Sequence, residues 1–306
     1  MVQSEIKATP LASRAARREG RAELSRRVKE WELAGLAAEG SLTQVYRAQP
    51  AGAPAGLPAP YALKILRPEW QDDPRAVGMI CREALVGRKV SHPHLISVLA
   101  ANVSGPPYYV VMPWLTGATL GHRLARRGPP DPPFALWTAR QVAEALDALH
   151  AAGWMHGDVK PSNVFVSPEG HATLLDLGFA RRPTETGSVV ERCVMGTGNY
   201  IAPELITSAL RADIRSDIYS LGAVLFEMLS GRLPFEGTSL AELAAQHQQA
   251  RPPDLRTLVP HLPTGVIRLV REMLAKEPLR RPQTPRELID RLVALEVATF
   301  AERTLD

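Results

Sequence analysis

Cysteines and long apolar runs are scarce in this sequence of 306 residues. Its two cysteines, Cys81 and Cys193, are too few for a disulfide framework or for a metal site with four cysteine ligands. No apolar stretch reaches the roughly 18 residues that a membrane-spanning helix requires, and the N-terminus lacks the apolar core of a signal peptide. We therefore expect a cytoplasmic location, reduced thiols and no membrane span in this chain.

Excess charge of one sign is also missing from most of the chain. The formal net charge is +4, and residues 1–30 contain eight Lys or Arg and four Asp or Glu, which accounts for the whole excess. The sequence thus predicts no basic face for nucleic acid. We interpret residues 1–29 as a flexible basic arm, with docking to a partner or to an anionic surface as the alternative. The sequence does not indicate an oligomeric state.

Apolar residues, by contrast, are abundant enough for a folded core, because 45% of the chain is hydrophobic. β-prone runs come first, and the predicted strands are 31–37, 42–48, 61–66 and 108–112. Between the last two, Asp73 and Pro74 predict the start of a helix that ends near residue 90. Helical spacing dominates later, with predicted helices at 134–149, at 218–229 and after a capping box at 284–287, and with a hairpin at 164–175. This order predicts an α+β protein of two lobes that divide near residue 115.

Polar residues suited to phosphate and metal chemistry lie in two neighbouring segments of the second lobe. The loop from His156 to Asn163 contains the carboxylate of Asp158 and the ammonium of Lys160. Asp176 follows at the end of the hairpin's second strand. The hairpin therefore brings together an amide and a carboxylate as candidate oxygen ligands for Mg²⁺.

A further charged residue lies inside an apolar strand of the first lobe. Lys64 is in the middle of the predicted strand 61–66, where an unpaired ammonium would be costly. Glu83, on the helix that follows, is the candidate partner.

Taken in order, these motifs resemble those of eukaryotic-type protein kinases, most closely the serine/threonine kinases found in bacteria. The matching segments are Tyr61–Lys64, Glu83, His156–Asp158, Asn163, Asp176–Gly178, Ala202–Glu204 and Ser216–Gly222, followed by Arg281 and Pro282. The match covers about residues 31–297, and seven motifs in order are far more specific than one.

The resemblance implies the two-lobed protein kinase fold within residues 30–300. We expect a small, mainly β N-lobe with one key helix over about 30–113. A larger, mainly α C-lobe would follow over about 116–300, and residues 301–306 would form a short tail.

The resemblance also implies how ATP would be held. Lys64 would bind the α- and β-phosphates and be oriented by Glu83. In the adenine pocket, Met112 would be the gatekeeper, the Pro113 carbonyl would accept the adenine amino group and the Leu115 N–H would donate to the ring. The residues expected to enclose the adenine ring are Val45, Ala62 and Phe165.

The same resemblance assigns the transfer step to the loop 156–163. Asp158 would accept or orient the proton of the substrate hydroxyl, and Lys160 would steady the transferring phosphate. Asn163 and Asp176 would hold Mg²⁺, with Mn²⁺ as the alternative metal ion. Lys160 followed by proline resembles serine/threonine rather than tyrosine kinases.

Several other residues resemble structural parts of the family. Glu204 and Arg281 would form a buried ion pair, and Asp217 would anchor the catalytic loop. His156 would pack beneath Asp176 rather than act as a base, and Thr197 would brace Asp158.

The sequence departs from the family pattern at three places, one of which is an insertion rich in Pro, Ala and Gly at residues 49–60 that we interpret as a surface loop. In the phosphate-covering loop only Gly40 remains of three glycines, with Ala38 and Thr43 at the other two positions, so we expect weaker or slower handling of ATP. Gly157 replaces the arginine that in many kinases pairs with a phosphorylated activation loop, so the chain is a non-RD variant. We therefore predict that activity does not require phosphorylation of that loop, whose candidate acceptors are Thr184, Thr186 and Ser188.

The function predicted from this resemblance is transfer of the γ-phosphate of MgATP to Ser or Thr hydroxyls of protein substrates. A pseudokinase that acts as a nucleotide-binding or scaffolding module is the alternative, suggested by the altered glycine loop. A kinase-fold enzyme acting on a small molecule is a third hypothesis, disfavoured by the segment from Gly196 to Glu204.

Overall fold

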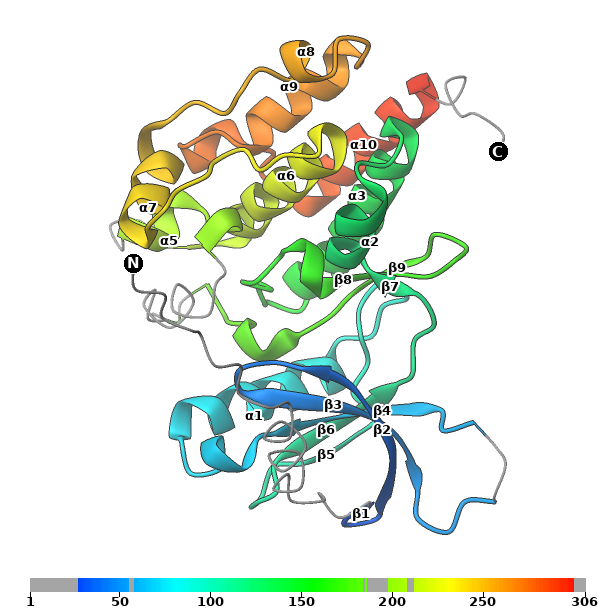
Figure 1. Cartoon of the computed structure of the whole chain (residues 1–306). Helices are drawn as coiled ribbons and strands as arrows, with labels where there is room; N and C mark the ends of the chain where they lie inside the picture. The colour runs from blue at the N-terminus through cyan, green and yellow to red at the C-terminus, as the bar shows by residue number, and fades with distance from the viewer. Residues whose placement is uncertain (1–26, 55–57, 184, 186–197, 208–211, 300–306) are drawn as a thin grey trace, which may run out of the picture.

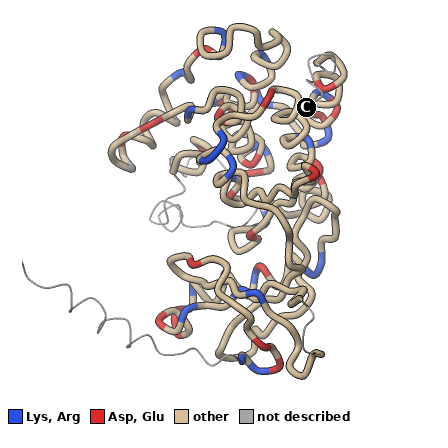
Figure 2. Tube along the Cα trace, turned by 45° about the vertical axis from the view of Figure 1, so that its right-hand side comes forward, with Lys and Arg blue, Asp and Glu red and all other residues tan. Residues whose placement is uncertain are grey.

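The computed structural model describes residues 27–54, 58–183, 185, 198–207 and 212–299. These residues form two lobes, a smaller one built on a β-sheet and a larger one built of helices (Figure 1). Basic and acidic residues are interspersed over both lobes (Figure 2), in keeping with the balanced charge of this part of the chain. The predicted α+β, two-lobed architecture is confirmed. Within the described residues, no helix is both long and apolar enough to cross a membrane.

In the part of the chain that the structure describes, the N-lobe sheet has six strands in the order β1-β2-β3-β4-β6-β5. Their bounds are β1 Arg27–Val28, β2 Trp31–Glu39, β3 Thr43–Pro50, β4 Tyr61–Leu66, β5 Ala100–Asn102 and β6 Tyr109–Pro113. All neighbouring strands are antiparallel. The sheet begins at Arg27, whereas the sequence predicted a flexible arm up to residue 29 and a domain from residue 30. The reason for this difference is that Arg27 and Val28 pair with Glu32 and Trp31, and Val28 is buried.

The central strands of this sheet are buried on both faces, which explains their nearly continuous apolar sequence. On β6, Tyr109 and Val111 belong to one hydrophobic cluster, whereas Val110 and Met112 belong to the other. This division follows the alternation of side chains along a strand. The cluster that contains Val110 and Met112 extends into the C-lobe and forms the main core of the molecule.

Helix α1, Pro74–Lys89, is the key helix of the N-lobe and has the predicted start. The Asp73 side chain accepts hydrogen bonds from the backbone N–H groups of Arg75 and Ala76, at 2.8 and 3.0 Å. Pro74 occupies the first turn, where its missing N–H costs nothing. Arg88 and Lys89 in the last turn complement the negative end of the helix.

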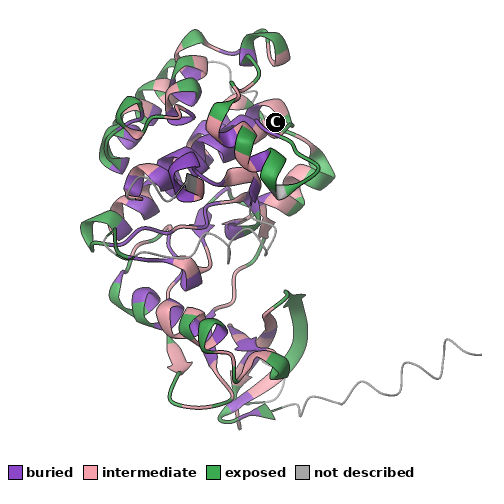
Figure 3. Cartoon of the chain, turned by 90° about the vertical axis from the view of Figure 1, so that its left-hand side faces the viewer, coloured by how far each residue is buried: buried purple, intermediate pink, exposed green. Residues whose placement is uncertain are grey.

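The C-lobe is built around α3, Pro132–Ala151, and α6, Ile214–Ser230, which pack against each other. Almost every residue of α6 is buried, as predicted from its apolar sequence (Figure 3). The other helices among the described residues are α2 Leu120–Arg127, α5 Pro203–Thr207, α7 Leu240–Gln249, α8 Leu255–Leu258, α9 Thr264–Met273 and α10 Pro285–Thr299. An ion pair of 2.8 Å between Arg140 and Glu296 joins α3 to α10.

A small sheet lies where the two lobes meet, in the order β7-β8-β9. Its strands are β7 Ala118–Thr119, β8 Val164–Val166 and β9 Ala172–Leu174, so the predicted hairpin is confirmed. Leu174 also bridges to Leu95, in the connection that follows α1. This hairpin places the loop 156–163, which precedes it, and the carboxylate of Asp176, which follows it, next to the N-lobe.

Candidate active site

Lys64 on β4 lies between two carboxylates that come from different parts of the chain. Its Nζ is 2.8 Å from Oε2 of Glu83 on α1 and 2.9 Å from Oδ1 of Asp176, which follows β9. The side chains of Lys64 and Glu83 are 12% and 1% exposed, so this pair is largely withdrawn from water. The structure thus brings together three residues that the sequence assigned to phosphate and metal binding.

The electrostatics of this group depend on burial and on the shared ammonium. Burial alone would lower the pKa of Lys64, but the charges of Asp176 and Glu83 outweigh it and raise that pKa. Burial would raise the pKa of Asp176, but the charge of Lys64 and its hydrogen bond lower it on balance. The pKa of Glu83 is raised because its burial outweighs the attraction of Lys64. Lys64 and Asp176 therefore both stay charged at neutral pH.

Backbone geometry aims Asp176 at this position. Asp176 has a φ of +63° and precedes the short 3₁₀ segment Leu177–Phe179. Its Oδ1 accepts the N–H of Gly178 at 3.3 Å, an Asx-type contact that favours the left-handed region for aspartate. Leu177, the next residue, is fully buried and packs in the main hydrophobic cluster, which holds this turn in place.

The loop that contains Asp158 is anchored from below by Asp217 on α6. The Asp217 carboxylate accepts the backbone N–H groups of His156 and Gly157, at 2.7 and 2.8 Å. Gly157 has a φ of +79°, which a glycine adopts without strain. This geometry is the anchoring arrangement that the sequence resemblance implied.

His156 is fully buried and acts as a spacer between two segments of the site. Its Nδ1 lies 3.2 Å from the backbone nitrogen of Asp158, and its Nε2 lies 2.9 Å from the carbonyl oxygen of Leu175. Since a backbone N–H can only donate, Nδ1 must accept and Nε2 must carry the proton. The His156 ring in this form links the backbone of Leu175, which precedes Asp176, to the backbone of Asp158.

Asp158 is held by two side chains on one carboxylate oxygen. Its Oδ2 lies 2.8 Å from Nδ2 of Asn163 and 2.8 Å from Nζ of Lys160. Asn163 also donates to the carbonyl oxygen of Asp158, at 2.9 Å. The other carboxylate oxygen, Oδ1, is buried and has no hydrogen-bond partner among the described residues. An aspartate with one oxygen held in place and the other without a hydrogen-bond partner is suited to accept a proton from a hydroxyl that binds against it.

The residues present fit a divalent metal ion that retains water ligands. Both donor hydrogens of the Asn163 amide face Asp158, so its carbonyl oxygen is the atom left for a metal ion. Asp176 uses Oδ1 for Lys64 and Gly178, which leaves Oδ2. Within the described residues there is no cluster of three or more His, Cys, Asp or Glu side chains that would hold a metal ion by itself. One amide and one carboxylate suit Mg²⁺, which is usually bound through few protein ligands.

The residues expected around adenine are placed on adjacent strands. Ala62 pairs with Met112 across β4 and β6, and Val45 on β3 pairs with Lys64. Val45 and Leu115 are partly buried and pack against the main cluster, to which Ala62 and Met112 belong. Pro113 pairs with Tyr61 at the end of the same ladder.

Phe165, the remaining residue expected at the adenine ring, lies on β8. It is half-buried, whereas its neighbours Val164 and Val166 are buried. Because side chains alternate along a strand, Phe165 faces away from the C-lobe core that those two valines enter.

The altered glycine loop connects the end of β2 at Glu39 to the start of β3 at Thr43. Ala38 is exposed and pairs with Val45, and Thr43 opens β3 opposite Leu66. The backbone N–H of Gly40 donates to the carbonyl oxygen of Thr43, at 2.8 Å. The turn is therefore closed by its own backbone.

Glu204 and Arg281 form the buried ion pair that the sequence resemblance implied. Two guanidinium nitrogens of Arg281 lie 2.7 and 2.8 Å from the two carboxylate oxygens, and Ser216 donates to the same carboxylate at 2.7 Å. The side chains of both charged residues are at most 2% exposed. This bidentate ion pair holds α5, which carries Glu204, against the segment of the C-lobe that carries Arg281.

Arg181 is a buried charged residue near the site that sequence reasoning missed. It is 6% exposed, and its Nε and Nη2 have no hydrogen-bond partner among the described residues. Burial lowers the pKa of its guanidinium, and the carboxylate of Asp217 opposes that effect. Its backbone pairs with Met155, directly before the catalytic loop. The sequence signal was weak, because two adjacent arginines, Arg181 and Arg182, read as surface charge.

Several predicted residues lie outside the described part of the chain. These are Thr197, Cys193 and the candidate phosphorylation sites Thr184, Thr186 and Ser188.

Comparison with known proteins agrees with this geometry. A family model described as "Protein kinase domain" matches residues 38–292. Serine/threonine-protein kinase PrkC of Bacillus subtilis is 33% identical over 227 residues, which is 74% of this chain and 35% of PrkC. Serine/threonine-protein kinase pkn2 of Myxococcus xanthus is 36% identical over 248 residues, covering 78% of this chain and 30% of the relative.

A third relative extends the similarity over more of the chain. Serine/threonine-protein kinase PknB of Mycobacterium tuberculosis is 32% identical over 289 residues, which is 90% of this chain and 45% of PknB. The chain thus spans less than half the length of the curated relatives named here. These relatives are named as kinases, so the pseudokinase alternative gains no support from them. With a family model over most of its length and the family's motif residues gathered around Lys64 and Asp158, this chain belongs to the protein kinase family.

Proposed function

We propose that this chain transfers the γ-phosphate of ATP to Ser or Thr hydroxyls of protein substrates. The observation that carries the proposal is the carboxylate of Asp158, with Oδ2 fixed by Asn163 and Lys160 and with Oδ1 buried and without a hydrogen-bond partner among the described residues. Phosphoryl transfer asks the protein mainly for positioning and charge neutralisation. The charged groups around Asp158 and Lys64 supply both.

ATP binding is assigned to the N-lobe side of the site. Lys64 is already oriented by Glu83, so an incoming phosphate meets an ammonium whose position is set. Its bond to Asp176 at 2.9 Å keeps that carboxylate beside the phosphate position. The adenine ring would lie against Val45, Ala62, Met112 and Phe165, with hydrogen bonds to the backbone of Pro113 and Leu115.

The transfer step is assigned to the loop 156–163. Oδ1 of Asp158 accepts the proton of the substrate hydroxyl as that oxygen forms its bond to the γ-phosphorus. The bond from the γ-phosphorus to the bridging oxygen breaks, and ADP leaves with that electron pair. The Lys160 ammonium, 2.8 Å from Asp158, is placed to offset charge on the transferring group.

A divalent metal ion, proposed to be Mg²⁺ with Mn²⁺ as the alternative, would be held by Asn163 and Asp176. When bound, it supplies positive charge that neutralises the phosphates of ATP. In the free protein the ammonium of Lys64 balances Asp176, so this carboxylate is kept ionised and ready for a cation.

The choice of Ser and Thr as acceptors rests on two observations. Lys160 followed by Pro161 resembles the serine/threonine kinases, and the three relatives named above carry that activity in their names. Since ATP is an intracellular nucleotide, a cytoplasmic location is part of the proposal.

The test is transfer of radiolabel from [γ-³²P]ATP, with Mg²⁺, to the chain itself and to a generic protein substrate. The matched control is Asp158→Ala, prepared identically and checked for folding by circular dichroism. Label on phosphoserine and phosphothreonine that is lost in the variant supports the proposal. Absence of transfer despite Mg²⁺-dependent ATP binding, or equal label with both proteins, contradicts it.

A further inference from the structure

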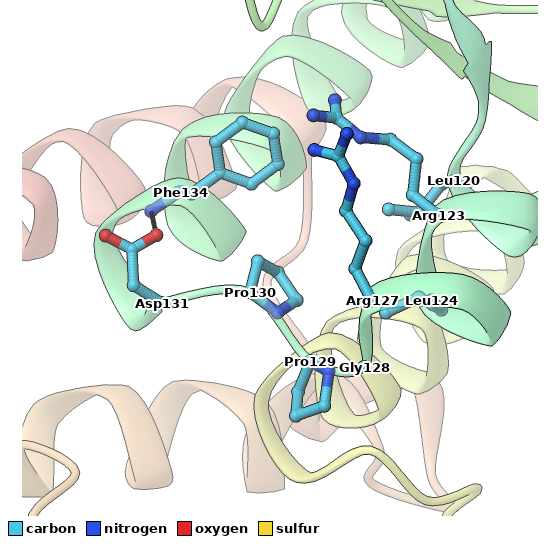
Figure 4. Close-up of a pocket in the computed structure, with 9 residues that line it drawn as sticks. All are labelled: Leu120, Arg123, Leu124, Arg127, Gly128, Pro129, Pro130, Asp131 and Phe134. Atoms are coloured by element: carbon cyan, nitrogen blue, oxygen red, sulfur yellow. Dashed lines mark hydrogen bonds between the residues drawn. The ribbon is translucent and has the colours of Figure 1, made fainter. Parts of the chain in front are cut away.

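A cavity lies in the C-lobe, and none of the residues around Lys64 lines it. It has a volume of about 320 Å³ and is formed by the end of α2, the loop that follows it and the start of α3 (Figure 4). That volume is within the range of small-molecule sites. The residues that line it are Leu120, Arg123, Leu124, Arg127, Gly128, Pro129, Pro130, Asp131 and Phe134.

The loop below this cavity is fixed by its sequence. Gly128 ends α2 with a φ of +76°, and Asp131 caps α3 by accepting the N–H of Phe134 at 3.2 Å. Pro129 packs against Gly231 at the end of α6, where a Cβ atom would come within 3.3 Å of the proline ring. The walls of the cavity are therefore largely preformed, which lowers the entropic cost of binding.

Two arginines on α2 give this cavity its charge. Figure 4 shows the guanidinium groups of Arg123 and Arg127 close together, one turn apart on the helix and facing the ring of Phe134. Within the described residues neither arginine forms an ion pair, and Nη1 of Arg123 is buried without a hydrogen-bond partner. Burial, with a smaller contribution from the charge of Arg127, lowers the pKa of Arg123. Two like charges held side by side, one of them with an unsatisfied buried donor, call for an anion.

The remaining wall of the cavity is apolar. Phe134 lies under Arg123, whose Cζ is 5.3 Å from the ring centroid, and Leu120, Leu124 and Pro130 complete the surface. The only carboxylate of the lining, Asp131, is turned toward the backbone of α3, on the opposite side from the guanidinium groups (Figure 4). The cavity thus combines a doubly positive side with an aromatic and aliphatic side.

From this arrangement we propose that the cavity binds the phosphate monoester of a small aromatic or aliphatic alcohol. The phosphate would accept hydrogen bonds from Arg123 and Arg127, and the organic group would pack on Phe134 and the leucines. A phosphate monoester carries a charge of about −1.5 to −2 at pH 7, which matches two adjacent guanidinium groups better than a single carboxylate does.

The test is calorimetric titration of the full chain with phenyl phosphate, with inorganic phosphate and benzoate as comparators. Binding of phenyl phosphate should weaken by about tenfold or more in Arg123→Gln and in Arg127→Gln, because each loses a charge-assisted hydrogen bond. Arg126→Gln is the matched control, since Arg126 is on the same helix but does not line the cavity. We expect the control to bind as the wild type does. Inorganic phosphate and benzoate should bind more weakly than phenyl phosphate.

Two results would overturn the proposal. One is equal affinity for phenyl phosphate in all four proteins, which would place any binding at the Lys64 site or elsewhere. The other is an affinity for inorganic phosphate that equals that for phenyl phosphate, which would show that the apolar wall takes no part. Arg127 is exposed, so its variant tests the site even where loss of the more buried Arg123 disturbs α2.

Discussion

Asn163 donates its side-chain amide both to the backbone carbonyl oxygen and to the carboxylate of Asp158, at 2.9 and 2.8 Å. A single amide therefore orients the proposed proton acceptor, while its remaining oxygen is available to a metal ion. Asn163→Ala should lower the rate of phosphate transfer by at least ~10², since both positioning and metal binding are lost. The same variant should lower the free energy of unfolding by ~1–3 kcal/mol, because buried acceptors on Asp158 lose their donor.

Rates and urea unfolding curves of the two proteins check this expectation. Ser162→Ala is a matched control, because Ser162 is the exposed neighbour on the same 3₁₀ segment. A variant at Asn163 with wild-type transfer rates would show that this amide does not hold the reacting groups.

The Lys64–Glu83 pair should reveal itself in protein stability as well as in catalysis. Lys64→Met leaves Glu83 buried without its partner, and we expect a loss of ~3 kcal/mol in the free energy of unfolding. Adding Glu83→Leu removes the unpaired carboxylate and should restore much of that loss, while phosphate transfer stays abolished in both proteins. Urea unfolding of the wild type, both single variants and the double variant provides the measurement. Additive losses in the double variant would contradict the account.

His247 predicts a pH dependence of stability. It lies on α7, is fully buried and has Nδ1 2.9 Å from the hydroxyl of Tyr219 on α6. Burial, with help from the charge of Lys276, lowers its pKa from 6.5 to about 4. The folded protein therefore binds this proton less readily than the unfolded chain does. Its stability should be constant above about pH 6.5 and fall by as much as ~3 kcal/mol as the pH drops toward 4.

The control for this prediction is His247→Gln, which cannot take up a proton in that range. Unfolding free energies at pH 7, 6 and 5 should fall more steeply for the wild type than for the variant. Parallel pH profiles would mean that His247 is not the group responsible.

Gly157 predicts that phosphorylation does not switch the enzyme on. Gly157 stands directly before Asp158, in place of the arginine described above. A phosphate on Thr184, Thr186 or Ser188 would therefore lack that arginine as a partner. Treatment with a phosphatase, followed by its removal, should leave the turnover rate within about twofold of the untreated value. Mass spectrometry must confirm that the phosphate has gone. A rate that disappears on dephosphorylation would refute the prediction, and Arg181 would then be the buried cation to examine.

Local signals in the sequence were sufficient for much of the fold. The cap at Asp73 and Pro74 placed α1 correctly, and the apolar run 61–66 was found as β4 with the predicted bounds. Both depend on neighbouring residues, for which sequence rules are strongest. The order of motifs then indicated which residues would meet. Nζ of Lys64 does lie less than 3 Å from a carboxylate oxygen of Glu83 and from one of Asp176.

Features that depend on distant contacts could not be predicted in the same way. β1 consists of two residues at the end of a basic segment, and only its pairing with Trp31 and Glu32 makes it a strand. Glu30 similarly accepts a hydrogen bond of 2.9 Å from the hydroxyl of Tyr109, which lies on β6 and is 79 residues away in the sequence. The burial of Arg181 and the pairing of Arg123 with Phe134 also arise from packing, which no periodicity in the sequence records.

We infer that Lys64, Asp176, Asn163 and Asp158 form one site for metal-bound ATP. The most direct measurement is the affinity for ATP by calorimetry, with and without Mg²⁺, in the wild type and in Asp176→Ala. We predict that Mg²⁺ tightens ATP binding to the wild type by about tenfold or more and has little effect on the variant. An unchanged affinity on adding Mg²⁺ to the wild type, or the same Mg²⁺ effect in Asp176→Ala, would contradict the account.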